Sequence, residues 1–216
     1  VPGRQSPGVV QAMDFLRAAE GAEASEAAPE PAALRDKSVV VVGGGLTGEV
    51  CVQMAVRSGA RAVQQIEILP QTEAAGKLDG ELPAEQVTRR WCTAAKAFHG
   101  NGQQLKGLEA VRVEHAPSPA GRQVREVTGS AFELDADMAL LALGFDAACP
   151  DDLAEQLGLE RDAAGRVVAD EFATSAEGVF VCGDLRNGAT YVATAIDSGR
   201  RAAETIHRHL TAARSA

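Results

Sequence analysis

Aromatic side chains, closely spaced cysteines and long apolar runs are scarce in this chain of 216 residues. Aromatic residues make up 4% of the sequence. No apolar run approaches the roughly 20 residues that cross a bilayer, so we expect no membrane partner. The cysteines are Cys51, Cys92, Cys149 and Cys182, with no Cys-x-x-Cys pair among them. We therefore expect reduced thiols, and neither a dithiol motif nor iron–sulfur ligands in this chain.

Metal ligands and positive charge are also in short supply. The histidines are His99, His115, His207 and His209, and none stands at ligand spacing from a cysteine or a carboxylate, so no metal site is predicted. Basic residues number 21 against 30 acidic ones, for a net charge of −9. This balance argues against nucleic acid and anionic membranes as partners.

The amino end of the chain carries no charged-then-apolar leader, and it begins with Val1 rather than Met. We therefore expect no secretory signal, and a processed chain or a fragment. The expected location is cytoplasmic, or plastid if the source is photosynthetic.

A strand, a glycine turn, a helix and a second strand follow one another within about 30 residues, which is typical of a βαβ unit. The four valines at 39–42 suit a strand buried on both faces, and the second strand is expected over 63–69. Helices are expected over 9–19, 85–98 and 190–210, and further strands over 106–114, 123–127, 131–134 and 139–143, with two short ones near 167–168 and 179–181. Weakly structured connections are expected over 20–33 and 71–82. The fold class is therefore α/β, with an inserted antiparallel meander.

The glycine turn has the spacing Gly43-x-Gly45-x-x-Gly48 between strand and helix. The first glycine permits a tight turn, the second lets backbone approach a pyrophosphate, and the third allows close packing. Glu67 ends the second strand, where a carboxylate can accept from a ribose hydroxyl. The candidate nucleotide-binding residues are Gly43, Gly44, Gly45, Thr47, Gly48 and Glu67. A glycine-rich turn without a ligand is the alternative.

The nucleotide itself stays open between NADH and NADPH. The charge of Glu67 would repel a 2′-phosphate and weakly favours NADH. Arginines that could attract the 2′-phosphate are Arg57, Arg61, Arg89 and Arg90. For the pair at 89–90, a solvated helix face is the competing interpretation.

The segment 174–184 carries a second signal, because its apolar strand ends in Gly183-Asp184 and a helix begins near Ala189. Together the two signals resemble the small, flavin-dependent subunit of glutamate synthase, within the flavoprotein reductases that have two dinucleotide-binding domains. The resemblance is carried by residues 1–4, 39–48, 63–70, 106–114, 138–145 and 174–200. It implies an N-terminal helix and linker over 1–34, an NAD(P)H-binding Rossmann-like domain over 35–145, and the C-terminal part of an FAD-binding domain over 146–216.

The resemblance also implies an activity. Hydride would pass from NADPH or NADH to FAD, and electrons onward to iron–sulfur clusters outside this chain. The partner would be the glutamate synthase large subunit, or fused glutaminase and synthase domains. The implied flavin-side residues are Gly144, Gly183, Asp184, Ala189, Thr190 and Tyr191. No side chain is assigned as a catalytic acid or base.

The sequence departs from the family at several points. The cysteine-rich region and the first FAD glycine motif do not precede Val1, so the FAD site in this chain is expected to be incomplete. Leu46 replaces an Asp of the glycine turn, the loop 71–82 is short, and an aromatic residue expected near Ala193 is missing. Two alternatives therefore stand beside the enzyme: a catalytically inactive nucleotide-binding or docking module, and a fragment of a longer flavoprotein reductase.

Overall fold

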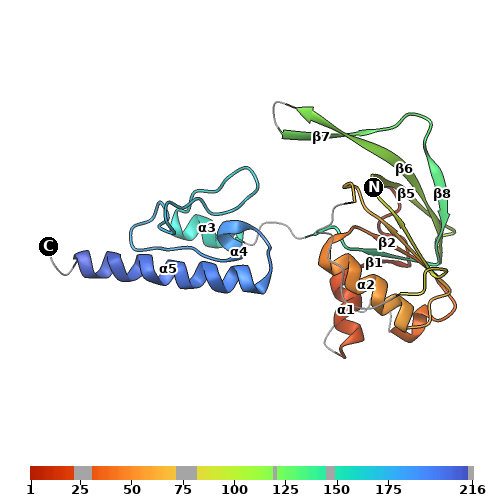
Figure 1. Ribbon diagram of the computed structural model, residues 1–216, viewed down its shortest axis with the longest axis horizontal. Coiled ribbons are helices and arrows are strands. Elements are labelled where there is room, and N and C mark those ends of the chain that lie inside the picture. The colour runs from red at the N-terminus through yellow and green to blue at the C-terminus, as the bar shows by residue number, and fades with distance from the viewer. Residues whose placement is uncertain (22–30, 72–81, 119–120, 145–148, 214–216) are drawn as a thin grey trace. The chain divides into compact units, whose positions relative to one another are not determined.

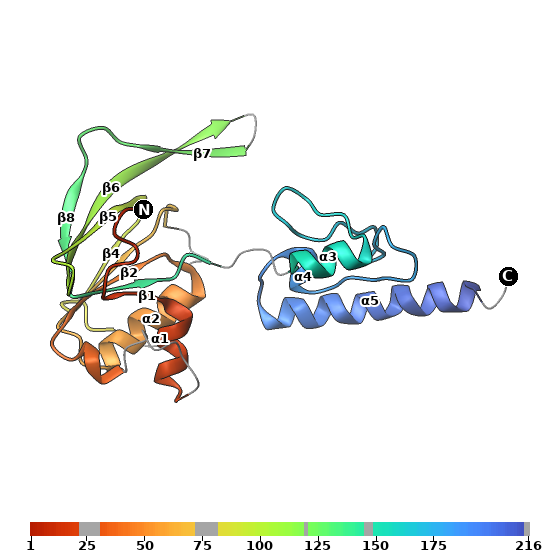
Figure 2. The same cartoon turned by 180° about the vertical axis from the view of Figure 1, so that it is seen from behind.

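The computed structural model describes residues 1–21, 31–71, 82–118, 121–144 and 149–213, and it divides into two units. Unit 1 is Val1–Leu143 and unit 2 is Gly144–Ala216 (Figures 1 and 2). Most of the two expected connections, 20–33 and 71–82, lies outside the described residues. The described end of the first is a 3-10 helix, Pro31–Leu34.

Unit 1 is built on a parallel sheet in the order β1-β9-β2-β3-β4. Its strands are β1 (Val9–Gln11), β2 (Ser38–Val42), β3 (Ala62–Ile66), β4 (Val87–Arg90) and β9 (Met138–Leu141). The central strand β2 is buried along its whole length, as its run of valines predicts. Val40 lies between Ala139 of β9 and Gln64 of β3. The predicted α/β fold is confirmed.

Two helices cover one face of this sheet (Figure 1). They are α1 (Ala12–Ala19) and α2 (Gly45–Arg57). Val39 and Val41 point to this side and pack in one core cluster with Phe15, Val52 and Leu140, all of which are completely buried. Burying apolar surface in this layer is the main stabilising contribution to the helical side of unit 1.

A second, antiparallel sheet covers the other face. Its strands are β5 (Thr93–Gly100), β6 (Leu105–Ser118), β7 (Gly121–Glu126) and β8 (Phe132–Asp135). Val40 and Val42 turn to this side and join a second cluster with Phe98, Leu108 and Leu134. The alternation of valines along β2 thus feeds two separate cores, one on each side of a single strand.

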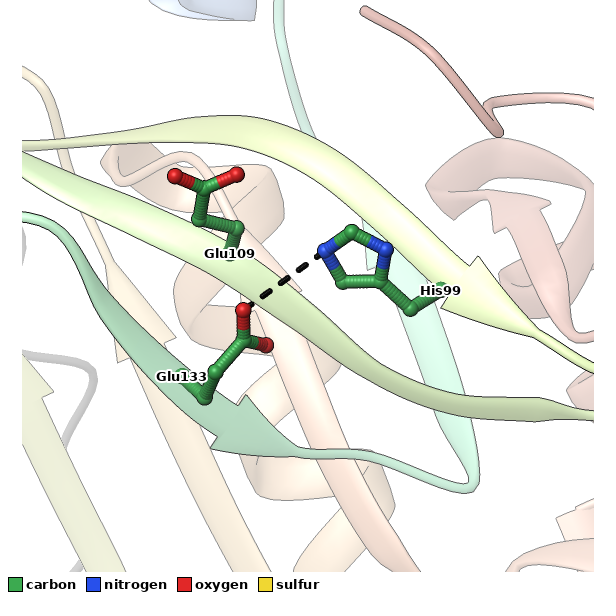
Figure 3. A group of neighbouring side chains, drawn as sticks. All are labelled: His99, Glu109 and Glu133. Atoms are coloured by element: carbon green, nitrogen blue, oxygen red, sulfur yellow. Dashed lines mark ion pairs between the residues drawn. The ribbon is translucent and has the colours of Figure 1, made fainter.

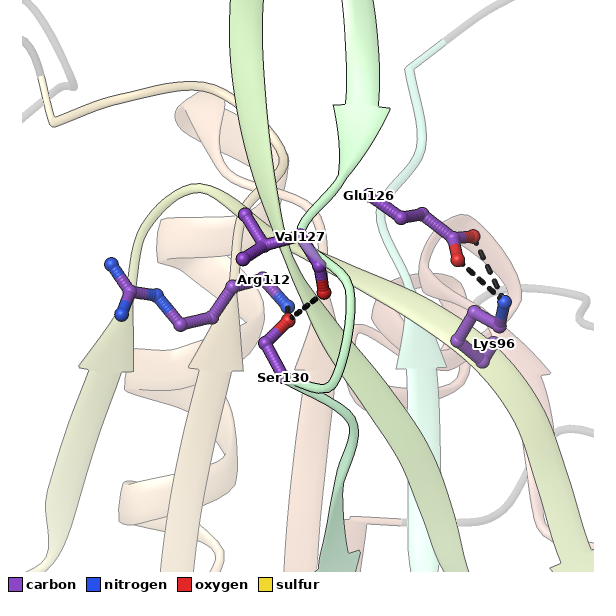
Figure 4. A network of polar contacts seen from close by, with 5 residues as sticks. All are labelled: Lys96, Arg112, Glu126, Val127 and Ser130. Atoms are coloured by element: carbon purple, nitrogen blue, oxygen red, sulfur yellow. Dashed lines mark hydrogen bonds and ion pairs between the residues drawn. The ribbon is translucent and has the colours of Figure 1, made fainter.

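The second sheet confirms the predicted meander. The long strand β6 pairs with β5 and β8 near its start, and with β7 near its end. The turn between β7 and β8 is hydrogen-bonded to β6 through Ser130. Its Oγ accepts from the Arg112 N–H of β6 at 3.1 Å and donates to the Val127 carbonyl within the turn at 2.7 Å (Figure 4). Lys96 of β5 and Glu126 of β7, two strands that both pair with β6, form an exposed ion pair.

Of the helix predictions in unit 1, one begins too early and another is wrong. The segment 9–19 begins as a strand, because β1 pairs in parallel with β9 before α1 starts at Ala12. The segment 85–98 contains no helix, since it forms β4, a turn and most of β5. Cys92 has φ of 50° in that turn, and hydrogen bonds to β3 and β6 replace those of a helix.

Unit 2 is described on its own. Its helices are α3 (Asp151–Leu157), α4 (Asp184–Asn187) and α5 (Val192–Ala213). Its core is small and consists of Cys149, Ala154, Val167 and Val181. The strands expected near 167–168 and 179–181 are reduced to isolated bridges, Arg161 with Val167 and Ala173 with Phe180. The expected C-terminal helix is present as α5.

We predict that Leu140→Ala destabilises unit 1 by about 2–5 kcal/mol, because Leu140 is completely buried in the helix-side core and its loss leaves a cavity. Leu69→Ala is the matched control, since Leu69 is 48% exposed and should lose less than about 1 kcal/mol. Urea unfolding followed by circular dichroism measures both. Equal losses would contradict the assigned position of Leu140.

Candidate functional site

The glycine turn lies at the carboxyl end of β2 and leads directly into α2. Gly43 has φ of 113°, and a Cβ there would lie 2.1 Å from the Ala142 carbonyl oxygen. A Cβ on Gly48 would lie 2.4 Å from the Gly43 carbonyl oxygen. Both positions therefore require glycine, because the turn, β9 and α2 pack too closely for a side chain.

Gly45 differs from these two, and the difference bears on ligand binding. Its φ is 68°, and a Cβ built on it meets no atom of the described residues within 4 Å. The backbone at Gly45 and Leu46 is exposed, and Thr47 beside them is half-buried. The absence of a side chain at Gly45 is therefore not explained by packing, and it leaves room for a ligand against the backbone.

The amino end of α2 suits an anion. Its N-cap, Gly44, makes no side-chain cap hydrogen bond, and the first turn contains no acidic residue. The first N–H groups of a helix have no partner within the helix, and they carry the positive end of its dipole. A phosphate at this point would supply the missing acceptors.

Glu67 lies beside the turn, as the sequence predicts. Its Oε1 accepts from the Leu69 N–H at 2.8 Å, and its Oε2 accepts from the Gly44 N–H. The carboxylate thereby fixes the turn to the end of β3. It also places one negative charge next to the amino end of α2.

The sequence did not reveal the polar contacts that join the glycine turn to β3 and β4. Gln65 is 2% exposed, and its Nε2 donates to the Gly43 carbonyl at 3.2 Å. Its Oε1 accepts from Arg89 Nε at 3.0 Å, and Arg89 also forms an ion pair with Glu49 of α2 at 2.5 Å. The turn, β3, β4 and α2 are thus tied together. The available signal was a pair of glutamines, Gln64 and Gln65, in the short strand β3.

The arginines considered for a 2′-phosphate lie in different places. Arg61 donates to Ser38 Oγ at 2.8 Å, at the amino end of β2, and Arg57 is the last residue of α2. Both therefore lie at the edge of the sheet opposite the turn. Arg89 and Arg90 lie at the carboxyl end of β4, on a strand rather than on the expected helix face. Arg90 donates to Gln64 at 3.0 Å.

In unit 2 the structure brings together part of the expected flavin-side set. Gly183 donates its N–H to Ser198 Oγ of α5 at 3.0 Å. Asp184 Oδ1 accepts from the Thr190 N–H at 3.2 Å and from its hydroxyl at 3.3 Å. Ala189 and Tyr191 are exposed beside them. These contacts close the loop between α4 and α5 around one carboxylate.

The remaining flavin-side candidate, Gly144, opens unit 2. It is exposed and has φ of 85°. The neighbouring residues 145–148 lie outside the described part of the chain, including the end of the expected 138–145 motif.

The cysteines lie apart and are all free thiols. Cys51 and Cys149 are buried, and burial raises the pKa of the Cys51 thiol to about 12, which keeps it protonated and unreactive. Cys92 is half-buried. Cys182 is exposed.

These features define a dinucleotide-binding α/β protein of the Rossmann type: a parallel sheet, a glycine turn at its carboxyl edge, a helix with a free amino end, and an acidic residue after the next strand. A family model described as pyridine nucleotide-disulphide oxidoreductase matches residues 2–199. The chain belongs to the pyridine nucleotide-disulphide oxidoreductase family.

Among curated proteins, the chain is 36% identical over 225 residues to the glutamate synthase [NADPH] small chain of Mycobacterium tuberculosis, covering 97% of this chain and 46% of that protein. It is 29% identical to the glutamate synthase [NADH] of Schizosaccharomyces pombe, covering 95% of this chain and 11% of that protein. The resemblance stated from the sequence is confirmed. The chain spans about half the length of the Mycobacterium tuberculosis relative and a smaller part of the Schizosaccharomyces pombe relative.

Among solved structures, Mycobacterium tuberculosis FprA in complex with NADPH matches with a TM-score of 0.72 at 16% identity, covering 100% of this chain and 61% of that one. This likeness supports the fold. Among the helices of the described residues, none is long and apolar enough for a bilayer.

We predict that Gln65→Leu destabilises unit 1 by about 1–3 kcal/mol, because it leaves the Gly43 carbonyl and Arg89 without their buried partner. Gln64→Leu is the matched control, since Gln64 is only half-buried and accepts a single hydrogen bond, from Arg90. Denaturant unfolding compares the two variants. An equal effect of both would show that the buried network does not support the turn.

Proposed function

We propose that this chain is the electron-input module of a glutamate synthase, taking hydride from NADPH or NADH into FAD. The observation that carries the proposal is the uncapped amino end of α2 beside Gly45, where the backbone is open. The similarity to glutamate synthase chains over nearly the whole sequence supports the choice of reaction. The whole activity would also require residues or chains outside this sequence, since the chain spans about half the length of the Mycobacterium tuberculosis relative.

The nucleotide would bind at the carboxyl edge of the parallel sheet. Its pyrophosphate would accept from the N–H groups of Gly45, Leu46 and Thr47 in the first turn of α2. Gly43, Gly44 and Gly48 shape the turn. Glu67 already accepts from the Gly44 N–H, and its remaining lone pairs can accept from ribose hydroxyls.

The choice between NADH and NADPH rests on charge. Glu67 places a carboxylate where a 2′-phosphate would approach, which favours NADH. Arg89 and Arg90, at the end of the adjacent strand, already donate to glutamate and glutamine side chains, so a 2′-phosphate would have to compete for them. The named relatives include both an NADPH and an NADH protein, so both nucleotides belong in the test.

The flavin would lie against unit 2. Asp184 would accept from ribityl hydroxyls through Oδ2, for which no described hydrogen bond is present, while Oδ1 accepts from Thr190. The exposed loop Ala189–Tyr191 would face the ring system, and Gly144 and Gly183 would allow close approach. When bound, FAD accepts hydride and can release electrons singly. The residues of this chain bind and orient, and none is needed as an acid or a base.

The proposed electron transfer beyond FAD would take place in other polypeptides or domains. Electrons would leave for iron–sulfur clusters held outside this chain, and then for a large subunit or for fused glutaminase and synthase domains. The relative in Schizosaccharomyces pombe, of which this chain covers 11%, is consistent with a fused arrangement. A cytoplasmic location is part of the proposal.

We predict that Gly45→Ala weakens NADH binding at least about tenfold, because the methyl group projects into the space proposed for the pyrophosphate. The cost in stability should be only about 1–2 kcal/mol of backbone strain, since no described atom crowds the new Cβ. NADH fluorescence titration and thermal unfolding measure the two effects.

Gly129→Ala is the matched control for this prediction. Gly129 has φ of 73° and equally open surroundings, but it lies in the turn between β7 and β8. The control should lose similar stability and retain full NADH affinity. Unchanged affinity in Gly45→Ala would refute the phosphate site.

The purified chain, incubated with FAD and freed of excess, tests whether its FAD site, expected to be incomplete, is sufficient. The electron-input function predicts a retained flavin absorption band that NADH or NADPH bleaches without oxygen. Asp184→Asn should weaken flavin retention, since the carboxylate is the stronger acceptor. A colourless protein that still binds NADH would favour the second candidate, a nucleotide-binding module without turnover. The observation that favours this second candidate is Leu46, which is exposed at the glycine turn where the family carries Asp.

A further inference from the structure

None of the residues assigned to a cofactor belongs to a group of three side chains that lie together on the outer face of the second sheet, although they are distant in the sequence. They are His99 of β5, Glu109 of β6 and Glu133 of β8 (Figure 3). Each offers one ligand atom, and these atoms lie within 4.8 Å of one another. His99 and Glu133 belong to strands that do not pair with each other, and β6 lies between them.

Strand register explains why the three side chains share a face. Glu109 pairs directly with Glu133 on one side and with Ala97 on the other, and His99 is two residues beyond Ala97. Residues directly opposite each other project to the same face, as do alternate residues of one strand. The intervening Phe98 lies in the core on the opposite face. The arrangement is therefore fixed by the backbone.

The cluster carries an unfavourable charge pair. Two carboxylates directly opposite each other on neighbouring strands repel, which destabilises a sheet. His99 Nε2 lies 3.6 Å from Glu133 Oε1, and an exposed pair at this distance compensates little of the repulsion. Lys96, on the same strand as His99, forms an ion pair with Glu126 at 2.7 Å and attracts Glu109 only as a weaker, secondary interaction. A bound cation would remove the repulsion.

We propose that His99, Glu109 and Glu133 bind a divalent transition-metal ion, for which zinc is the appropriate probe. One imidazole nitrogen and two carboxylate oxygens are ligands that zinc accepts, with water as the fourth. Ligands at about 2.0–2.1 Å around a tetrahedral ion lie about 3.3 Å apart. The exposed side chains of His99 and Glu133 are free to close that distance by rotation. The ion would connect β5 to β8 across β6.

Zinc titration of the full chain, followed by calorimetry, tests the proposal. We expect one saturable site that His99→Gln and Glu133→Gln each weaken at least about tenfold. His207→Gln and Cys182→Ser are the controls. His207 and Cys182 are exposed in unit 2 and offer an imidazole and a thiol that could bind zinc outside the proposed site. Both controls should bind zinc as the unchanged chain does.

Thermal unfolding separates a lost ligand from a lost fold. Without metal, Glu133→Gln should be at least as stable as the unchanged chain, because it removes the repulsion with Glu109. With zinc, only the unchanged chain and the controls should gain in melting temperature. The proposal fails if the chain binds no zinc, if the His99 and Glu133 variants bind it normally, or if Cys182→Ser alone abolishes binding.

Discussion

The burial of β2 on both faces is the constraint on which unit 1 depends. A strand with four consecutive valines must be covered on both faces, and the chain meets this requirement with helices on one face and a second sheet on the other. Because β2 also has a hydrogen-bonded neighbour at each edge, its carboxyl end is held firmly. The glycine turn begins from that fixed point.

The glycine turn follows directly from the fixed end of β2 and is also held by its own hydrogen bonds. Gly43 is packed against β9, while Glu67 and the buried Gln65 tie the turn to β3. A preformed turn spends little binding energy on ordering its backbone when a ligand arrives. The same supports set the local charge, because a carboxylate rather than a guanidinium lies nearest the turn. Sheet packing, turn geometry and the proposed nucleotide preference therefore have a common origin.

The sequence predicts those parts of the fold whose signals are local. The valine run, the spaced glycines and the alternating residues of the meander each determine their own structure, and all were placed correctly. The strands β1, β4 and β5 were missed because their conformation depends on pairing with strands distant in the sequence. The cluster of His99, Glu109 and Glu133 was missed for a related reason, since only register brings its members together. Gln65 likewise shows its role only once Gly43 and Arg89 lie beside it.

The place of β9 in the sheet has a consequence for synthesis on the ribosome. β9 is the last strand of unit 1 in the chain, yet it lies between β1 and β2. Until it emerges, the valines of β2 have an open edge and β1 has no partner in this sheet. Such an edge is prone to pairing with other chains. The nascent unit is therefore open to such pairing until β9, which ends at Leu141, has emerged from the ribosome.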